Sequence, residues 1–331
     1  MSDSISNLDP YKFLKIKHNP DGSLTRFAPL PSAQATPQLT TDSQLTLSKD
    51  IPLNPTNSTF LRLFRPVSPA TNRKLPIIIY FHGGGFILFS ATSDPFNRSC
   101  STISAHTPTL MISVEYRLAP EHRLPAAYDD AVEAVCWLRD QALGINGCDE
   151  WLTEFADFSQ VFIMGSSSGG NIVYNAGLRV PDLDLNPIKI VGLIFHQPFF
   201  GGVERTGSEI RHVNDRIAPL VATDLMWSLA LPEGSDRDHP YCNPIRDIDD
   251  ISRDEKIKRL PRCMIRGYFG DPFYDKQIEF ADMLESRSVD VIRTFVEGFH
   301  GIEVFEPQKA QLLYDDVKNF VSLFVEKKST L

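Results

Sequence analysis

Residues 161–170 read VFIMGSSSGG, and this segment decides the fold of the chain. The run 161–164 is typical of a buried strand, and residues 171–176 continue as a helix. A serine on a tight strand-to-helix turn exposes its hydroxyl at the carboxyl edge of a sheet, and the turn needs small residues two positions away on either side. Gly165 and Gly169 meet that need around Ser167. The alternative is a loop or helix cap rich in Ser and Gly, because this pattern also occurs by chance.

A second apolar run, LPIIIYF at residues 75–81, is the strongest strand pattern in the chain. Its nearly continuous hydrophobicity is typical of a parallel strand that is covered on both faces. It leads into HGGGF at residues 82–86. Three successive glycines weaken packing and cost backbone entropy, so they indicate either a flexible turn or a loop whose amides must closely approach a ligand oxygen.

Strand and helix patterns alternate along most of the chain. Strands are expected at 45–47, 59–64, 109–116, 188–195, 262–267 and 289–295, and helices at 131–141, 276–286 and within 308–324. This alternation predicts an α/β fold with a mostly parallel central sheet and helices on both faces. No internal repeat or low-complexity linker interrupts it, so a single domain over residues 1–331 is expected.

Two segments stand outside the alternation. Residues 9–31 are interpreted as a short amphipathic helix and a turn, or as a surface extension, and 32–43 as an exposed loop. Residues 201–251 contain a helix pattern around 222–231 and then a loop rich in charged and turn-forming residues. An insertion of this size is either a lid or a surface excursion, and we favour the lid.

Composition excludes several classes of protein. The chain has 42% hydrophobic and 23% charged residues, with 42 acidic against 33 basic side chains and a formal charge of −9. Without a basic block, nucleic acid is not an expected partner. No apolar stretch is long enough to span a bilayer, and residues 1–7 lack the pattern of a secretory signal, so a soluble, cytoplasmic protein is expected.

The cysteines give no metal or disulfide pattern. The five are scattered, without a CxxC pair or a histidine at zinc-ligand spacing: Cys100, Cys136, Cys148, Cys242 and Cys263. We therefore expect reduced thiols and no metal. The glycine-rich loops also lack a Walker lysine and the GxGxxG spacing, so no nucleotide or other cofactor is expected.

A serine hydroxyl needs a base, and an imidazole serves best when a carboxylate holds its tautomer. On α/β sheets that carry such a serine turn, the acid and then the histidine follow the serine in the chain. This order removes the four histidines before residue 167. His196 ends a predicted core strand, whereas His212 and His239 lie in the expected lid. His300, between the last strand and the last helix, is the favoured base over a merely solvated loop histidine.

The acid is expected at the end of the preceding strand, where residues 270–275 read GDPFYD. Asp271 is nearer the strand end and is chosen over Asp275, which fits the start of the following helix. Helix capping is the alternative role for Asp271. The amides of Gly84, Gly85 and Ser168, with that of Gly83 as a further candidate, are expected to stabilise the oxyanion that forms when Ser167 attacks a carbonyl.

These motifs together resemble the hormone-sensitive-lipase branch of the α/β-hydrolases, and within it the plant carboxylesterases. The resemblance rests on HGGGF at 82–86, YRLAPE at 116–121, the serine turn and Asp271-Pro272, and it extends over nearly the whole chain. It implies Ser167, Asp271 and His300 as nucleophile, acid and base, with the amides of Gly84, Gly85 and Ser168 as the oxyanion hole. It also implies short acyl esters, especially acetates of plant secondary metabolites, as substrates.

The chain departs from the family pattern at two positions. Ser166 replaces the usual acidic residue before the nucleophile, and Ser168 replaces the usual alanine after it. The amide of Ser168 is retained, so activity is expected, with the rate and the rigidity of the turn in question.

The resemblance also brings two alternatives. Gibberellin receptors share the fold but resemble a hydrolase that has lost its catalytic histidine, and the presence of His300 argues against that role. Dehydratases and cyclases use a similar pocket for other chemistry, which product analysis distinguishes.

The architecture of this fold suggests a cap made by residues 1–45 and part of 201–251. Phe86, Ile87, Phe199 and Phe200 are interpreted as either a hydrophobic substrate pocket or ordinary core. The expected partner is a small-molecule ester, and the expected assembly is a monomer or a weak dimer.

Overall fold

The computed structural model describes residues 8–27, 29–68, 73–246 and 251–325. Residues 1–7, 28 and 247–250, which belong to the expected signal-free amino terminus and the two expected cap segments, lie outside the described part.

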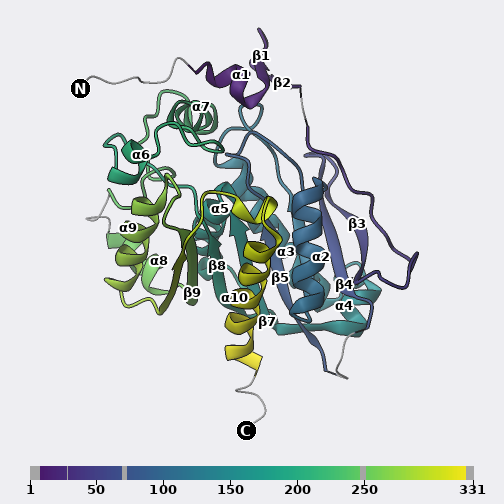
Figure 1. The fold of residues 1–331 in the computed structure, drawn as a ribbon. Helices are drawn as coiled ribbons and strands as arrows, with labels where there is room; N and C mark the ends of the chain where they lie inside the picture. Colours follow the sequence, from purple (N-terminus) through teal and green to yellow (C-terminus); the bar gives the residue numbers. More distant parts are fainter. Residues whose placement is uncertain (1–7, 28, 69–72, 247–250, 326–331) are drawn as a thin grey trace, which may run out of the picture.

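A central sheet of eight strands runs in the order β10-β9-β8-β7-β5-β6-β4-β3 within this described part (Figure 1). Strands β10 to β6 pair in parallel, whereas β4 and β3 extend the sheet antiparallel. The bounds are β3 (Thr46–Asn54), β4 (Thr59–Pro66), β5 (Leu75–Phe81), β6 (Leu110–Glu115), β7 (Ala156–Ser166), β8 (Ile190–His196), β9 (Arg262–Tyr268) and β10 (Val291–Val296). The predicted mostly parallel sheet is confirmed.

Helices cover both faces of the sheet, as predicted (Figure 1). One face carries α3 (Ala126–Leu143), α5 (Ser168–Gly177), α8 (Ile251–Lys258) and α9 (Tyr274–Glu285), and the other carries α2 (Asp94–His106) and α10 (Pro307–Val325). Strand β5 explains its own apolar run: Ile77 and Ile79 face the first core, whereas Ile78 and Tyr80 face the second. Because successive side chains of a strand alternate between faces, a strand covered on both sides must be apolar throughout.

Short elements lie together at one end of the molecule in Figure 1. They are α1 (Pro10–Leu14), the hairpin of β1 (Ile16–His18) and β2 (Leu24–Arg26), and α7 (Leu220–Ala230), against which α1 packs. Glu121 fixes the hairpin to the body, since it accepts a hydrogen bond from the Leu24 amide (2.8 Å) and pairs with the Arg26 guanidinium (2.9 Å). That these elements act as a cap stays a prediction.

Several helices were not predicted. They include α2 and the shorter α4 (Glu150–Phe155), α6 (Gly207–Arg211), η1 (Val180–Asp182) and η2 (Ile302–Val304), and α3 begins five residues before the predicted start. The α2 segment is rich in Ser, Thr and Asn, which favour turns over helix interiors. Burial of Cys100 and Ile103 against the sheet stabilises α2, and this tertiary contact is absent from the local sequence pattern.

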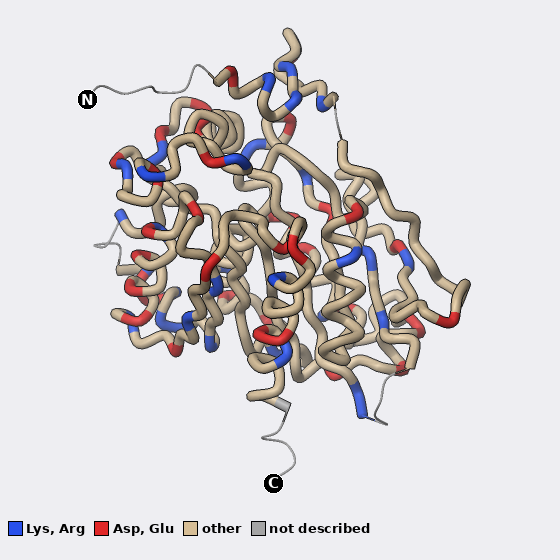
Figure 2. The backbone as a smooth tube through the Cα atoms, viewed as in Figure 1, with Lys and Arg blue, Asp and Glu red and all other residues tan. Residues whose placement is uncertain are grey.

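Charges of both signs are interspersed along the chain in Figure 2. Within the described residues, the longest helices are too short or too polar to cross a membrane.

Candidate active site

Ser167 lies in the turn between β7 and α5, with φ 55° and ψ −120°. Such a conformation is strained for a residue with a side chain and persists only where neighbours enforce it. The Ser167 amide donates to the carbonyl of His196 on β8 (2.9 Å), and the Ser167 carbonyl accepts from the Phe199 amide (2.9 Å). The turn is therefore held on both sides by the strand next to it.

The two glycines that flank this turn have no room for a side chain. A Cβ on Gly165 would collide with the backbone of Gly169, and a Cβ on Gly169 would collide with the carbonyl of Phe81 at the end of β5. Close approach of β5, β7 and α5 thus explains why glycine stands two positions before and two positions after Ser167.

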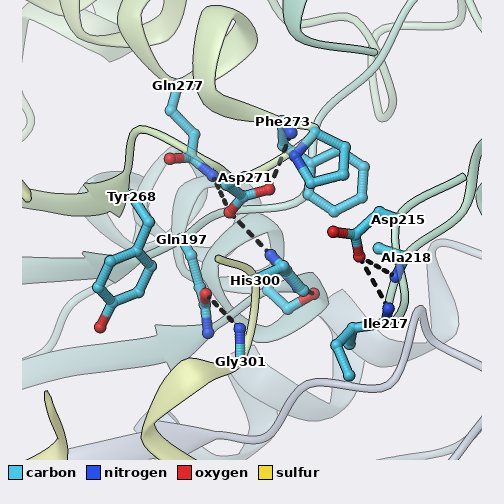
Figure 3. A network of polar contacts seen from close by, with 12 residues as sticks. Gln197, Asp215, Ile217, Ala218, Tyr268, Asp271, Phe273, Gln277, His300 and Gly301 are labelled. Atoms are coloured by element: carbon cyan, nitrogen blue, oxygen red, sulfur yellow. Dashed lines mark hydrogen bonds and ion pairs between the residues drawn. The ribbon is translucent and has the colours of Figure 1, made fainter. Parts of the chain in front are cut away.

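His300 connects Ser167 with Asp271. Its Nε2 lies 3.0 Å from Ser167 Oγ, and its Nδ1 lies 2.8 Å from Asp271 Oδ2. Figure 3 shows the contact between His300 and Asp271. The three residues follow β7, β9 and β10, whose carboxyl ends lie at one edge of the sheet.

Asp271 is fully buried and held by two further donors. The Phe273 amide donates to its Oδ1 (2.8 Å), and the Gln277 side chain donates to its Oδ2 (3.1 Å) (Figure 3). The alternative acid, Asp275, instead accepts from the Ser208 amide (2.7 Å) and faces α6. The carboxylate beside His300 is therefore that of Asp271.

Charge around His300 favours its protonated form. Burial lowers the pKa of His300, but the charge and hydrogen bond of Asp271, together with the charges of Asp215 and Glu303, outweigh burial and raise the pKa above its ordinary value. Asp215 is fixed nearby because it accepts from the amides of Ile217 and Ala218 (Figure 3). The imidazole is thus prepared to take up a proton from a neighbouring hydroxyl.

The triple-glycine loop lies beside Ser167. A Cβ on Gly83 would lie 3.1 Å from Ser167 Cβ, and Gly84 and Gly85 have φ values of 123° and 61°. The amides of these three glycines donate to no other group within the described residues. Ser168 begins α5, where a backbone amide has no acceptor within its own helix. All four amides are available to a negatively charged oxygen.

A cavity of about 640 Å³ contains Ser167 and His300. Phe13 and Leu14 of α1 and Met226 of α7 contribute to its wall, as do the three glycines and Phe199.

The other three aromatic and aliphatic residues proposed for the pocket are placed in the core. Phe86 has φ 67°, which turns its ring onto Tyr128 and Trp227. Ile87 is fully buried, and Phe200 packs against Phe280. Of the four, only Phe199 lines the cavity.

A second polar chain, absent from the sequence-based site, lies next to the first. Ser166 Oγ lies 2.9 Å from His196 Nδ1, and His196 Nε2 bonds the carboxylate of Glu303 on η2. The unusual serine at position 166 was visible in the sequence. Its partners were not, since His196 and Glu303 lie 30 and 137 residues further along the chain and meet it only through the fold.

No cluster of three or more His, Cys, Asp or Glu residues suited to a metal ion occurs within residues 8–27, 29–68, 73–246 and 251–325.

Comparison with known proteins gives consistent results. The family described as alpha/beta hydrolase fold matches residues 78–304. Probable carboxylesterase 8 of Arabidopsis thaliana is 55% identical over 95% of this chain and 93% of its own length. A 3-O-acetylpapaveroxine carboxylesterase of Papaver somniferum is 50% identical over 95% of this chain and 97% of its own. The structure of a hyperthermophilic esterase from Pyrobaculum calidifontis superposes with a TM-score of 0.68 at 22% identity, over 84% of this chain and 86% of that one.

Proposed function

The chain belongs to the α/β-hydrolase family as a carboxylic-ester hydrolase similar to plant carboxylesterases, and from this premise we propose that Ser167 is its nucleophile. The observation that carries the proposal is the hydrogen-bonded sequence Ser167–His300–Asp271, with 3.0 Å from Ser167 Oγ to His300 Nε2 and 2.8 Å from His300 Nδ1 to Asp271. In this proposal His300 is the general base and Asp271 orients it.

The reaction proceeds in two halves. His300 Nε2 takes the proton of Ser167 as Oγ attacks the ester carbonyl, and the same proton then passes to the departing alkoxide, which leaves as the alcohol. Water enters, gives a proton to His300 and attacks the acyl-serine. His300 returns that proton to Ser167 as the carboxylic acid leaves. Asp271 stays ionised and stabilises the imidazolium that forms in each half.

The amides of Gly83, Gly84, Gly85 and Ser168 stabilise the tetrahedral oxyanion. Free donors that are fixed before the reaction need no reorganisation when the negative charge develops, and removal of one such donor costs about 2.7–4 kcal/mol of transition-state stabilisation. The rigid turns at Gly84 and Ser167 support this assignment.

We propose short-chain, acetyl-type esters of small plant metabolites or xenobiotics as substrates. The name of the Papaver relative includes an acetyl ester, and a cavity of about 640 Å³ suits a small molecule. The chemistry uses side chains alone, without a cofactor. The five unpaired thiols suit the reducing cytoplasm, which we propose as the location.

Two alternatives remain distinct from this proposal. A binding protein of the receptor type needs no base, so the contact between His300 and Ser167 favours an enzyme. A dehydratase or cyclase would use the same pocket without forming an acyl-serine, and its products contain no new acid and alcohol pair.

Hydrolysis of 4-nitrophenyl esters from acetate to octanoate tests the proposal. Wild type is expected to turn over the shortest esters fastest, and Ser167→Ala and His300→Ala are expected to remove about 10⁴-fold or more of kcat. His122→Ala, which alters an exposed histidine outside the cavity, is the matched control and should keep wild-type rates. Folded wild type without turnover, or full activity in Ser167→Ala, contradicts the proposal.

A further inference from the structure

Two consecutive serines each contact their own histidine, and each histidine contacts a carboxylate. Beside Ser167–His300–Asp271, the second sequence runs from Ser166 through His196 to Glu303. Its imidazole has the opposite orientation, with Nδ1 toward the serine and Nε2 toward the acid. Ser166, His196 and Glu303 all line the same cavity as Ser167. The second chain therefore borders the space in which a substrate must sit.

The two oxygens of Glu303 have different surroundings. Oε1 accepts from His196 Nε2 and from the Tyr268 hydroxyl, and Arg266 Nη1 lies 3.7 Å away. No side chain within the described residues donates to Oε2. The Glu303 side chain is only 10% exposed, and it borders the cavity. A nearly buried carboxylate oxygen without a donor is costly, so this arrangement points to an occupant of the cavity that supplies one.

Glu303 is ionised at any pH at which the protein works. Burial raises the pKa of Glu303, but the charge of His196 and the bonds from His196 and Tyr268 outweigh burial and lower the pKa to about 2. The nearest fixed cation, Arg266, is already paired with Asp316 (2.8 Å). Negative charge on the cavity wall is thus a fixed feature.

Cations on the cavity wall leave this charge largely uncompensated. Arg26 and Arg98 are paired with acidic neighbours, as Glu121 and Asp94 respectively bind them. Lys15 and Arg216 are exposed, and Arg216 stacks on the ring of Phe299 (3.7 Å). Exposed charges are screened by salt much more than a buried carboxylate is.

We propose that Glu303 is a specificity-determining residue whose Oε2 binds a protonated amine on the ester substrate. This inference rests on the proposed esterase function and adds the class of ester. An ammonium group matches the site better than a hydroxyl, because a hydrogen bond between two charged groups is roughly twice as strong as one between neutral groups. Ser166, His196 and Tyr268 are positioning residues that occupy Oε1 and leave Oε2 to the substrate.

Pairs of isosteric esters test the proposal, with the amine on either side of the ester bond. The alcohol-side pair is 2-(dimethylamino)ethyl acetate and 3-methylbutyl acetate. The acyl-side pair is methyl 4-(dimethylamino)butanoate and methyl 5-methylhexanoate. The kcat/KM of each ester is measured by pH-stat at pH 7 for wild type, for Glu303→Gln and for Glu306→Gln. Glu306 is exposed, lies outside the cavity and provides the matched control.

In at least one pair, wild type and Glu306→Gln should prefer the amine ester by about tenfold or more, the effect of one hydrogen bond to a buried charge. Glu303→Gln keeps an oxygen for His196 and Tyr268 but removes the negative charge, and it should abolish the preference while turnover of the neutral ester persists. Equal losses on both esters of a pair would show a positioning role alone and overturn the proposal, as would a wild type that does not prefer either amine ester.

If wild type hydrolyses neither these esters nor 4-nitrophenyl acetate, the esterase proposal fails separately. Calorimetric titration of the two amine esters then decides the amine site by itself. Binding that is weakened about tenfold or more in Glu303→Gln supports the site, and equal binding or none overturns it.

Discussion

Asp271 is the residue on which the proton affinity of His300 most directly depends. Its charge and hydrogen bond act against burial and hold the pKa of His300 above its ordinary value. His300 must be neutral to accept the proton of Ser167, so kcat/KM falls as the pH decreases through this raised pKa.

Replacement Asp271→Asn should lower kcat by about 10⁴-fold, because the amide no longer holds the catalytic tautomer. Removal of the negative charge also lowers the pKa of His300, so the acid limb of the remaining kcat/KM profile should move to lower pH. A pH–rate profile of a 4-nitrophenyl ester measures both effects. Asp275→Asn, on the neighbouring helix, should keep the wild-type profile, and an unshifted acid limb in Asp271→Asn contradicts the assignment.

Gly84 offers a test of the proposed oxyanion site. With φ 123°, it occupies backbone space that favours glycine, and an added Cβ would collide with the carbonyl of Leu88. Gly84→Ala must therefore shift the loop, and we expect kcat to fall about 10²–10³-fold, as for the loss of one oxyanion donor. Gly147→Ala also has positive φ but adds its Cβ into open space, so it should retain activity. Equal kcat values for the two variants would argue against a role for this loop.

At the scale of single residues, sequence pattern and structure agree best where local geometry dictates residue type. Glycines around Ser167 and the order of serine, acid and histidine lead to the three residues that the fold brings together. Phe86, by contrast, points into the core because of its positive φ, which no sequence pattern reveals. The partnership of Ser166 with Glu303 is likewise a property of tertiary contacts.

Secondary-structure elements were predictable in proportion to their burial. Strand β5 coincides with the predicted residues 75–81 because it is apolar on both faces. Helix α2 escaped prediction because its polar residues dominate the local pattern, although Cys100 and Ile103 anchor it. Strand β3 extends to residue 54, well beyond the predicted 45–47, because pairing with β4 stabilises its polar second half.

The β1–β2 hairpin depends on one carboxylate. Glu121→Gln removes the charge that binds Arg26 and weakens acceptance from the Leu24 amide, so the hairpin amides should exchange with deuterium about tenfold faster. KM should rise as well, since the adjoining Phe13 and Leu14 line the cavity. Exchange measured by mass spectrometry, with the exposed Glu255→Gln as control, checks this expectation. Unchanged exchange in the hairpin would show that other contacts hold it.

Acidity should act on the same link. Burial raises the pKa of Glu121, but bonds from Arg26 and the Leu24 amide outweigh it and lower the pKa to about 2. A carboxyl whose pKa is lower in the folded state stabilises that state above its unfolded pKa of about 4.3. This contribution should be lost as the pH falls from there through about 2. A comparison of wild-type and Glu121→Gln unfolding free energies across this range should show the two curves converging toward low pH.

The molecule as a whole keeps its sulfur chemistry away from solvent. All five cysteines are unpaired, and Cys100, Cys242 and Cys263 are buried. Burial raises the pKa of all three thiols, that of Cys100 to about 12. Thiolates, which are the reactive form, are therefore scarce at these positions.

Titration with 5,5′-dithiobis(2-nitrobenzoate) should accordingly separate two classes of thiol. In the native protein only the partly exposed Cys136 and Cys148 should react, whereas all five should react in guanidinium chloride. A Cys136→Ser, Cys148→Ser double variant should show no rapid native reaction. Reaction of more than two thiols in the folded wild type would contradict the buried positions.

The separation of Ser167 from His300 has a consequence for biogenesis. These residues lie 133 positions apart, and His300 follows β10, which pairs with the sheet only through β9. A nascent chain on the ribosome thus carries its serine turn long before it possesses a base. Recovery of catalysis during refolding should report the docking of this last edge strand, and it should lag behind the far-ultraviolet signal of the β5–β7 centre of the sheet.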